Sequence, residues 1–236
     1  MGLPVMEGYG LTETTAPMAG NRPGRIRSGT VGELVPGTAV RIDDQSHVWV
    51  RGVGVSPGYL DPDQTAASFR DGWFDTGDLG RLDEDGYLTI TGRAKDVLVT
   101  AGGKTVSPQA WERSVSADPL VAHAVVVGDR EPYLSSLLLL DQENTDAWAL
   151  DHAAEVPGPA GQGQAVEVTN PDLVARMAAL VEAANTTVAR SETVKRFRVL
   201  LADLSVESGL LTPTQKLRRQ AVVERFAPVI EDIYRR

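Results

Sequence analysis

The sequence predicts an α/β chain of the α+β type, built from two consecutive units. Residues 29–92 alternate short runs rich in Val, Ile, Trp and Tyr with Gly, Pro and Asp turn signals, which is typical of an antiparallel β region. After Arg93 the pattern changes to strands interleaved with helices. With 42% hydrophobic and 23% charged residues, the 236-residue chain has the composition of ordinary globular domains. We therefore expect one unit over residues 1–94, β-rich from about residue 29, and a second over residues 95–236.

The first unit is expected to be a set of short strands joined by tight turns. Asp85-Gly86 is the clearest hairpin signal, because this dipeptide favours the positive φ angles of a two-residue turn. The strands are expected within the runs TVGELV (30–35), AVRI (39–42), HVWVRG (47–52) and YLTITG (87–92).

The second unit is expected to begin with a strand in the run DVLVTA, residues 96–101. Ser107 and Pro108 predict the start of a helix, because serine caps a helix well and proline loses no hydrogen bond at the first helical position. The remaining elements are expected in this order: strands at 122–129 and 134–140, a Pro- and Gly-rich surface loop at 154–170, and a helix at 172–190 whose apolar residues share one face.

Charge and composition exclude several classes of function. A net charge of −9 argues against general nucleic-acid binding, because such binding depends on Lys and Arg neutralising phosphates. The absence of cysteine excludes disulfides and thiolate metal sites, and the three histidines have no metal-ligand spacing. No apolar run approaches the roughly 20 residues that span a bilayer, and the N-terminus has no signal-peptide pattern. We therefore expect a cytoplasmic protein without a transmembrane segment or a nucleic-acid partner.

Two short motifs lie in the first unit. Tyr9-Gly10-Leu11-Thr12-Glu13 places a ring, a hydroxyl and a carboxylate around a glycine, although a strand that ends in a turn also has this pattern. Asp75-Thr76-Gly77-Asp78 follows two aromatic residues, although Asp and Gly also occur in turns for backbone reasons. Each motif is a weak signal by itself, and their order along the chain carries more information.

Two further motifs follow. In the first, GRAKD (92–96) runs into an apolar strand that ends at Gly102-Gly103, and such a pair marks a turn or a place where another molecule passes close to the backbone. The second is LTPTQK (211–216). Taken alone, the basic residues in and beside these motifs are interpreted as solvated surface charges, and Glu112 as a helix residue that caps or pairs locally. The basic residues concerned are Arg93, Lys95, Lys104, Lys216, Arg218 and Arg219. For Lys104, Arg218 and Arg219, a position beside a bound phosphate is the alternative.

In their order and spacing, these four motifs resemble the adenylate-forming superfamily of acyl-CoA synthetases, luciferases and peptide-synthetase adenylation domains. VTAGGKTVSP and LTPTQKLRR look most like its long-chain fatty acyl-CoA synthetase branch, and the resemblance covers practically the whole chain. It implies a remnant of the N-terminal adenylating domain with a distorted β-barrel, followed by the small, mobile C-terminal α+β domain. It also implies ATP-dependent ligation of a fatty acid to CoA through acyl-AMP, with ATP/AMP, Mg²⁺ and CoA as cofactors and substrates.

The resemblance assigns a role to each motif residue of the first unit. Glu13 matches the carboxylate that binds Mg²⁺, and a hard oxygen ligand suits that ion. Asp78 matches the acceptor of both ribose hydroxyls, and Arg93 a second ribose contact, which donates. The remaining matches are Tyr9 beside adenine, Gly10 among the nucleotide-binding residues, and Thr12 as the hydroxyl that contacts the α-phosphate.

The resemblance also assigns roles to residues around and within the second unit. Lys216 matches the lysine that reaches the α-phosphate and the substrate carboxylate during adenylation. Lys95 matches the hinge about which the C-terminal domain swings between the two half-reactions. Gly102, together with Gly103, matches the glycine turn that contacts CoA, where a side chain would obstruct pantetheine.

One part of the family pattern has no counterpart in this sequence. A full-length member is more than twice as long and carries a Ser/Thr/Gly-rich phosphate loop before the tyrosine motif. We therefore expect this chain to be the C-terminal part of the enzyme and inactive in adenylation by itself. The alternatives are a fatty acyl-AMP ligase, another acid:CoA ligase, and a non-catalytic interaction domain derived from one. A homodimer and peripheral membrane contact are both left open.

Overall fold

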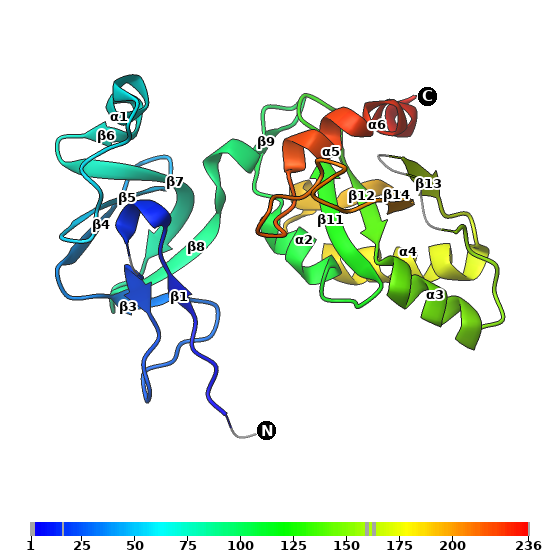
Figure 1. The fold of residues 1–236 in the computed structure, drawn as a ribbon, viewed down its shortest axis with the longest axis horizontal. Helices are drawn as coiled ribbons and strands as arrows, with labels where there is room; N and C mark the ends of the chain where they lie inside the picture. Colours follow the sequence, from blue (N-terminus) through cyan, green and yellow to red (C-terminus); the bar gives the residue numbers. More distant parts are fainter. Residues whose placement is uncertain (1–2, 16, 159–160, 162–163, 236) are drawn as a thin grey trace. The chain divides into compact units, whose positions relative to one another are not determined.

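A computed structural model describes residues 3–15, 17–158, 161 and 164–235. The chain divides into two compact units, Met1–Val97 and Leu98–Arg236. Figure 1 shows strands predominating in the first and a mixture of strands and helices in the second. The mixed α/β class is as predicted, and the domain boundary predicted between residues 94 and 95 stays a prediction.

The first unit is built on one antiparallel sheet. Its strands follow the order β1-β2-β3-β8-β7-β5-β4, and β6 pairs with β7 outside this path. Among the described residues, β1 and β4 are not paired with each other, so the expected barrel is an open sheet. One end of the path has strands of only two residues, too short for an extended closing ladder. The elements are β1 Gly8–Tyr9, η1 Thr12–Thr14, β2 Ala19–Gly20, β3 Gly32–Leu34, β4 Thr38–Ile42, β5 His47–Gly52, α1 Pro62–Ser68, β6 Phe69–Arg70, β7 Trp73–Leu82, β8 Tyr87–Arg93 and η2 Ala94–Asp96.

Strand β7 pairs with three other strands of this sheet, β5, β6 and β8. Every second residue from Phe74 to Gly80 is buried, as expected of a strand with one face on a core. Phe74 packs there with Met18, Val48 and Val50. The predicted hairpin between β7 and β8 is confirmed, although its turn covers Asp83 to Gly86.

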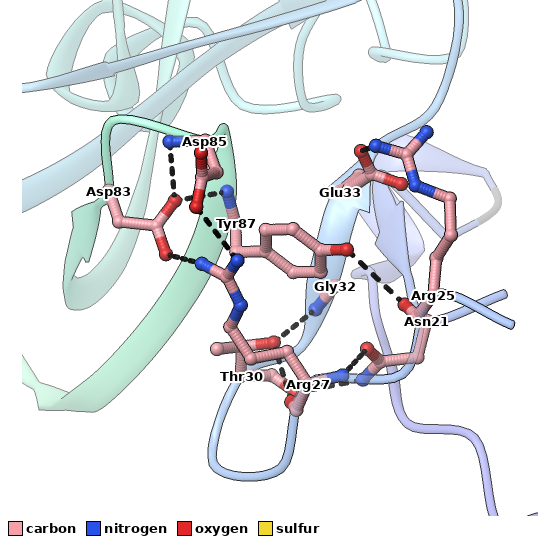
Figure 2. Close-up of polar contacts among 9 residues, drawn as sticks. All are labelled: Asn21, Arg25, Arg27, Thr30, Gly32, Glu33, Asp83, Asp85 and Tyr87. Carbon is pink, nitrogen blue, oxygen red and sulfur yellow. Dashed lines mark hydrogen bonds and ion pairs between the residues drawn. The ribbon is translucent and has the colours of Figure 1, made fainter.

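A polar cluster fastens the loop before β3 to the β7–β8 hairpin (Figure 2). Arg27 donates to Asp83 at 2.6 Å and to Asp85 at 2.8 Å. Its guanidinium carbon lies 3.9 Å from the ring centroid of Tyr87. The backbone N–H of Arg27 donates to Asn21 Oδ1 at 2.9 Å, which fixes the base of the loop. One arginine thus joins segments separated by 56 and 58 residues.

The second unit is built on a four-stranded sheet with helices on both faces, and β9 and β10 form a separate two-stranded sheet. The strand order is β11-β12-β14-β13, with β12 and β14 parallel and the other pairs antiparallel. The elements are β9 Leu98–Val99, β10 Thr105–Val106, α2 Gln109–Val115, β11 Val121–Val127, β12 Leu134–Leu140, α3 Gln142–Asp151, β13 Ala165–Glu167, α4 Pro171–Asn185, η3 Arg190–Glu192, β14 Val194–Ala202, α5 Arg219–Arg225 and α6 Ala227–Tyr234.

Strand β12 shows why this unit needs helices on both faces. Leu138 and Leu140 pack into the core that contains Trp111 of α2 and residues of α3 and α4. Leu137 and Leu139 pack into a second core with residues of α5 and α6. A strand buried on both faces has a continuous apolar run instead of alternation, which explains LSSLLLL.

Several predicted elements of the second unit need correction. The strand predicted at 96–101 is reduced to β9, because residues 94–96 form the 3-10 turn η2. Helix α2 begins at Gln109, and Pro108 rather than Ser107 occupies the capping position. Helix α4 ends at Asn185, whose side chain bonds the backbone of Val194 at the start of β14. Among the described helices, none combines the length and apolar character needed to cross a membrane.

Candidate functional site

Three residues predicted from separate motifs meet in the first unit. Asp78 lies within β7 and is paired in register with Arg93 of β8. The Arg93 Nε lies 3.0 Å from Asp78 Oδ1, and the Tyr9 hydroxyl donates to Asp78 Oδ2 at 2.5 Å. The Asp78 side chain is only 4% exposed, whereas that of Arg93 is 44% exposed. The structure thus brings Tyr9, Asp78 and Arg93 together through one hydrogen bond and one ion pair.

The residues before Asp78 explain how the strand presents this carboxylate. Gly77 has a φ of +68°, a left-handed conformation that glycine adopts without steric cost. Its N–H donates to Asp75 Oδ1 at 2.9 Å, and the Thr76 hydroxyl donates to Val48 O at 2.7 Å. The Thr76 oxygen also accepts from the N–H of Asp78 at 3.1 Å. Each residue of the DTGD motif therefore has a local role in fixing Asp78.

Burial and charge set the protonation state of Tyr9. Burial of the phenol raises its pKa well above the ordinary value, and the hydrogen bond to Asp78 raises it further. Tyr9 therefore remains a protonated donor at neutral pH. Asp78 keeps acceptor capacity beyond these two contacts, because each carboxylate oxygen has two lone-pair sites.

A second group forms around Glu13 in the turn η1. The Tyr59 hydroxyl donates to Glu13 Oε1 at 2.9 Å, and the Ser56 N–H donates to the Glu13 carbonyl at 2.7 Å. Burial raises the pKa of Tyr59, and so does its hydrogen bond to Glu13. The neighbouring Thr12 is exposed, as is Gly10. Sequence reasoning missed Tyr59, for which the only local signal is a ring beside Gly58.

The donor set around Glu13 can be tested against the expected Mg²⁺. Among the described residues, no three His, Cys, Asp or Glu side chains are grouped as a protein metal cage would require. Mg²⁺ in nucleotide sites is commonly held by one or two carboxylates together with substrate phosphates and water. Glu13 as a single half-buried carboxylate therefore fits an ion that is bound mainly by a nucleotide.

In the second unit, Lys216 lies on a tight hairpin. The Thr212 N–H donates to the Lys216 carbonyl at 2.8 Å, and the Lys216 N–H donates to Thr212 Oγ1 at 3.0 Å. Gln215 has a φ of +61°, and a bridge between Leu211 and Leu217 closes the turn. Lys216 itself is exposed. The backbone of this turn is fixed, and its lysine side chain projects from it.

The interpretation of Arg219 as a surface charge is wrong, as is that of Glu112 as a local pair. Arg219 Nη1 lies 2.6 Å from Glu112 Oε1, and the two side chains are 20% and 15% exposed. Arg219 also donates to the carbonyl of Val126, and the Val126 N–H donates to Glu112 Oε1 at 2.7 Å. The pair joins α2 to the start of α5 across 107 residues, a separation that local sequence patterns do not reveal.

Of the two glycines after β9, only Gly103 has a backbone conformation that favours glycine. Gly103 has a φ of +74°, so its backbone conformation favours glycine. A Cβ at Gly102 would meet nothing nearer than Thr100 Oγ1 at 3.9 Å, so the fold of this unit leaves room for a side chain there. The Ala101 N–H donates to the Glu131 carbonyl at 2.9 Å and holds the turn. Lys95 is exposed in η2, within the first unit.

Comparison with solved structures defines the class of fold. The chain is similar to o-succinylbenzoate CoA synthetase from Bacillus subtilis in complex with its acyl-adenylate intermediate, at 23% identity and a TM-score of 0.67. That likeness covers 94% of this chain and 41% of the other. It is also similar to the adenylation domain of a carboxylate reductase from Mycobacterium chelonae, at 21% identity and a TM-score of 0.72, covering 97% and 34%. The fold is therefore that of adenylate-forming enzymes.

The family follows from the sequence match. Residues 95–157 and 159–236 match the AMP-binding enzyme C-terminal domain, and the chain belongs to this family. It is 44% identical over 234 residues to the long-chain-fatty-acid–CoA ligase FadD15 of Mycobacterium tuberculosis, covering 99% of this chain and 38% of that protein. It is 32% identical over 247 residues to human long-chain-fatty-acid–CoA ligase ACSBG1, covering 96% and 34%. The chain thus spans about two fifths or less of the length of these relatives.

Proposed function

We propose that this chain serves the ATP-dependent ligation of a long-chain fatty acid to CoA. The observation that carries the proposal is the meeting of Tyr9, Asp78 and Arg93, which three separate motifs assign to one nucleotide. The similarity to ligases named for long-chain fatty acids supports the choice of substrate. The reaction has two steps: a carboxylate oxygen attacks the α-phosphorus of ATP and displaces pyrophosphate, and the CoA thiolate then displaces AMP from the acyl carbon.

In the first step, the residues of the first unit bind the nucleotide. Asp78 accepts hydrogen bonds from the ribose hydroxyls, and Arg93 donates to the same sugar. The Tyr9 ring lies beside adenine, while its bond to Asp78 keeps the carboxylate oriented. Thr12 donates to the α-phosphate, and Glu13 binds the divalent cation of the nucleotide, which would neutralise charge on the phosphates.

Lys216 supplies the positive charge for the same step. Charge gathers on the phosphate oxygens as the carboxylate attacks, so a cation at this point lowers the barrier. A lysine on a fixed turn suits the task, because the flexible stem lets the ammonium follow the reacting atoms. The exposed position of Lys216 leaves it available to a bound acyl and phosphate group.

In the second step, the second unit changes its role by rotating about Lys95. This residue lies in the short turn η2, at a place where a few backbone dihedrals can absorb a large motion. After the rotation, Gly102 and Gly103 face the site in place of Lys216. A missing side chain at Gly102 admits the pantetheine of CoA, and packing within the unit gives no other reason for that glycine.

The test is a chimera in which this chain replaces the aligned residues of FadD15 from Mycobacterium tuberculosis. We expect fatty-acid-dependent exchange of pyrophosphate into ATP, and thioester formation when acyl-AMP and CoA are supplied. A folded chimera that exchanges with no fatty acid would contradict the proposal. A chimera that forms acyl-AMP without any thioester would favour an acyl-AMP ligase instead.

A further inference from the structure

We propose that Tyr59 is a positioning residue for Glu13, whose carboxylate it holds so that the other oxygen faces the divalent cation of a bound nucleotide. The inference rests on the function proposed above and extends it to a residue outside the four motifs. Its basis is the contact between the Tyr59 hydroxyl and Glu13 Oε1 at 2.9 Å. The two residues are 46 positions apart, so the contact is a product of the fold.

The Tyr59 ring is anchored and cannot swing freely. It packs edge-to-face on Phe69, with ring centroids 6.2 Å apart, and Phe69 in turn lies 4.9 Å from Phe74 of β7. The Tyr59 N–H donates to Thr65 Oγ1 of α1 at 2.8 Å. Ring and backbone are therefore both fixed, and the hydroxyl is presented from a rigid base. Pre-organisation of this kind is what orients a ligand side chain.

The loop that carries Tyr59 is also fastened directly to the Glu13 turn. Besides the Ser56 contact to the Glu13 carbonyl at 2.7 Å, the Thr15 hydroxyl donates to the Gly54 carbonyl at 2.8 Å. A Cβ at Gly54 would lie 2.7 Å from the Thr14 carbonyl oxygen, so the approach of these two segments requires glycine. Backbone and side chain of Glu13 are thus held by the same loop.

The chemistry of the carboxylate explains what this contact achieves. An ionised carboxylate accepts at two oxygens and has about four lone-pair positions. Tyr59 occupies one position on Oε1, which fixes the rotation of the group and leaves Oε2 for a cation. Phosphates of a nucleotide supply the other ligands of such an ion. Loss of an outer-shell partner of a metal ligand typically weakens metal affinity by about 10–100-fold.

The experiment uses the full 236-residue chain as wild type, Tyr59→Phe, Glu13→Gln and Tyr87→Phe. Free Mn²⁺ is measured by electron paramagnetic resonance during titration in the presence of ATP, and ATP affinity is measured separately without metal. In Tyr59→Phe we expect Mn²⁺ affinity to fall by about ten-fold at unchanged metal-free ATP affinity. Tyr87→Phe is the matched control, since its hydroxyl donates only to the Arg25 carbonyl at 3.5 Å among the contacts of the described chain.

A second readout separates this inference from the proposed function. NMR relaxation of the Glu13 side chain is measured without metal or nucleotide. Relative to wild type, the motion of this side chain should increase in Tyr59→Phe and stay unchanged in Tyr87→Phe. Unchanged Glu13 motion overturns the positioning role whatever the chain binds. Unchanged Mn²⁺ affinity in Tyr59→Phe, beside a loss in Glu13→Gln, overturns the positioning role and keeps the nucleotide site. A wild type that binds no ATP overturns the proposed nucleotide site, and increased Glu13 motion would then still support the positioning contact.

Discussion

Asp78 in the first unit and Lys216 in the second are held in opposite ways. The Asp78 side chain is 4% exposed; one of its oxygens accepts a hydrogen bond from Tyr9, and the other forms an ion pair with Arg93. Lys216 is exposed, and its backbone N–H and carbonyl are hydrogen-bonded to Thr212. In the part of the chain that the structure describes, its ammonium has no ion pair. The Asp78 carboxylate is therefore fixed by its neighbours, whereas the Lys216 ammonium lies exposed on a turn whose backbone is fixed.

The difference fits the task proposed for each residue. A carboxylate that selects a sugar by accepting hydrogen bonds gains from a fixed position, because ligand binding then costs less ordering. A lysine that must meet a reacting group in one step and leave it in the next gains from having no permanent partner. A permanent salt bridge would have to be broken in every cycle. The two regions therefore suggest different sensitivities to mutation.

Lys216→Ala should produce the largest effect, and it tests the role proposed for the exposed lysine of the second unit. In the FadD15 chimera we expect adenylation to fall by about 10²–10³-fold, the usual cost of removing one group that stabilises transition-state charge. Thioester formation from supplied acyl-AMP should be unchanged, as should the temperature of unfolding. Pyrophosphate exchange and thioester assays on the same preparation measure the two steps.

Lys195→Ala is the matched control, because Lys195 is also exposed in the second unit. It should leave both steps unchanged. Equal losses of both steps in Lys216→Ala would contradict the idea that this lysine serves only one of them.

Asp78→Asn tests the buried carboxylate of the first unit. Hydrogen bonds to charged groups are worth about 1.5–3 kcal/mol, so we expect KM for ATP to rise by roughly 10–100-fold. The temperature of unfolding should also fall, because Arg93 and Tyr9 lose an ionised partner. Kinetics of exchange and thermal unfolding measure the two effects. Glu84→Gln, an exposed carboxylate in the same unit, is the control, and an equal effect there would contradict the assignment.

The two glycines after β9 allow a similar comparison within a single turn, between a glycine that the backbone conformation favours and one that we propose CoA requires. Gly103→Ala forces an alanine into a φ of +74° and should lower the free energy of unfolding by about 1–2 kcal/mol. Gly102→Ala meets no atom closer than 3.9 Å and should leave stability nearly unchanged. We expect Gly102→Ala to slow thioester formation while sparing adenylation. A Gly102→Ala variant with normal thioester kinetics would show that CoA does not pass this position.

Local sequence signals predicted the features that depend on few neighbours. Asp85-Gly86 gave the β7–β8 hairpin, where Gly86 has a φ of +85°. The DTGD motif marked Asp78 because its residues fix one another within four positions. The four ordered motifs identified the family, which the comparisons then bore out.

Contacts between distant segments could not be predicted in this way. The pairs Tyr59–Glu13 and Arg219–Glu112 join residues 46 and 107 positions apart, and nothing near either residue signals its partner. The open sheet of the first unit likewise depends on which strands pair, and strand patterns alone do not decide that. Such partners become visible only when the chain is folded, because packing of the whole sheet sets them.

The Arg27 cluster gives the smallest expected effect. It tests whether many hydrogen bonds and ion pairs in one place are enough to indicate a nucleotide-binding site. Hydrogen bonding by the Tyr87 N–H, together with Arg27, lowers the pKa of Asp83 below its ordinary value of 3.8. A carboxyl with a lowered folded-state pKa stabilises the fold above its unfolded pKa, and this contribution is lost as the pH falls through the folded value. Arg27→Gln should therefore lower the unfolding temperature slightly at pH 7, and this difference should shrink as the pH falls below 3.8 through the lowered pKa of Asp83. Thermal unfolding measured across this pH range tests the effect, and ATP binding should not change. A loss of ATP binding as large as that of Asp78→Asn would mean that the nucleotide site extends to this cluster.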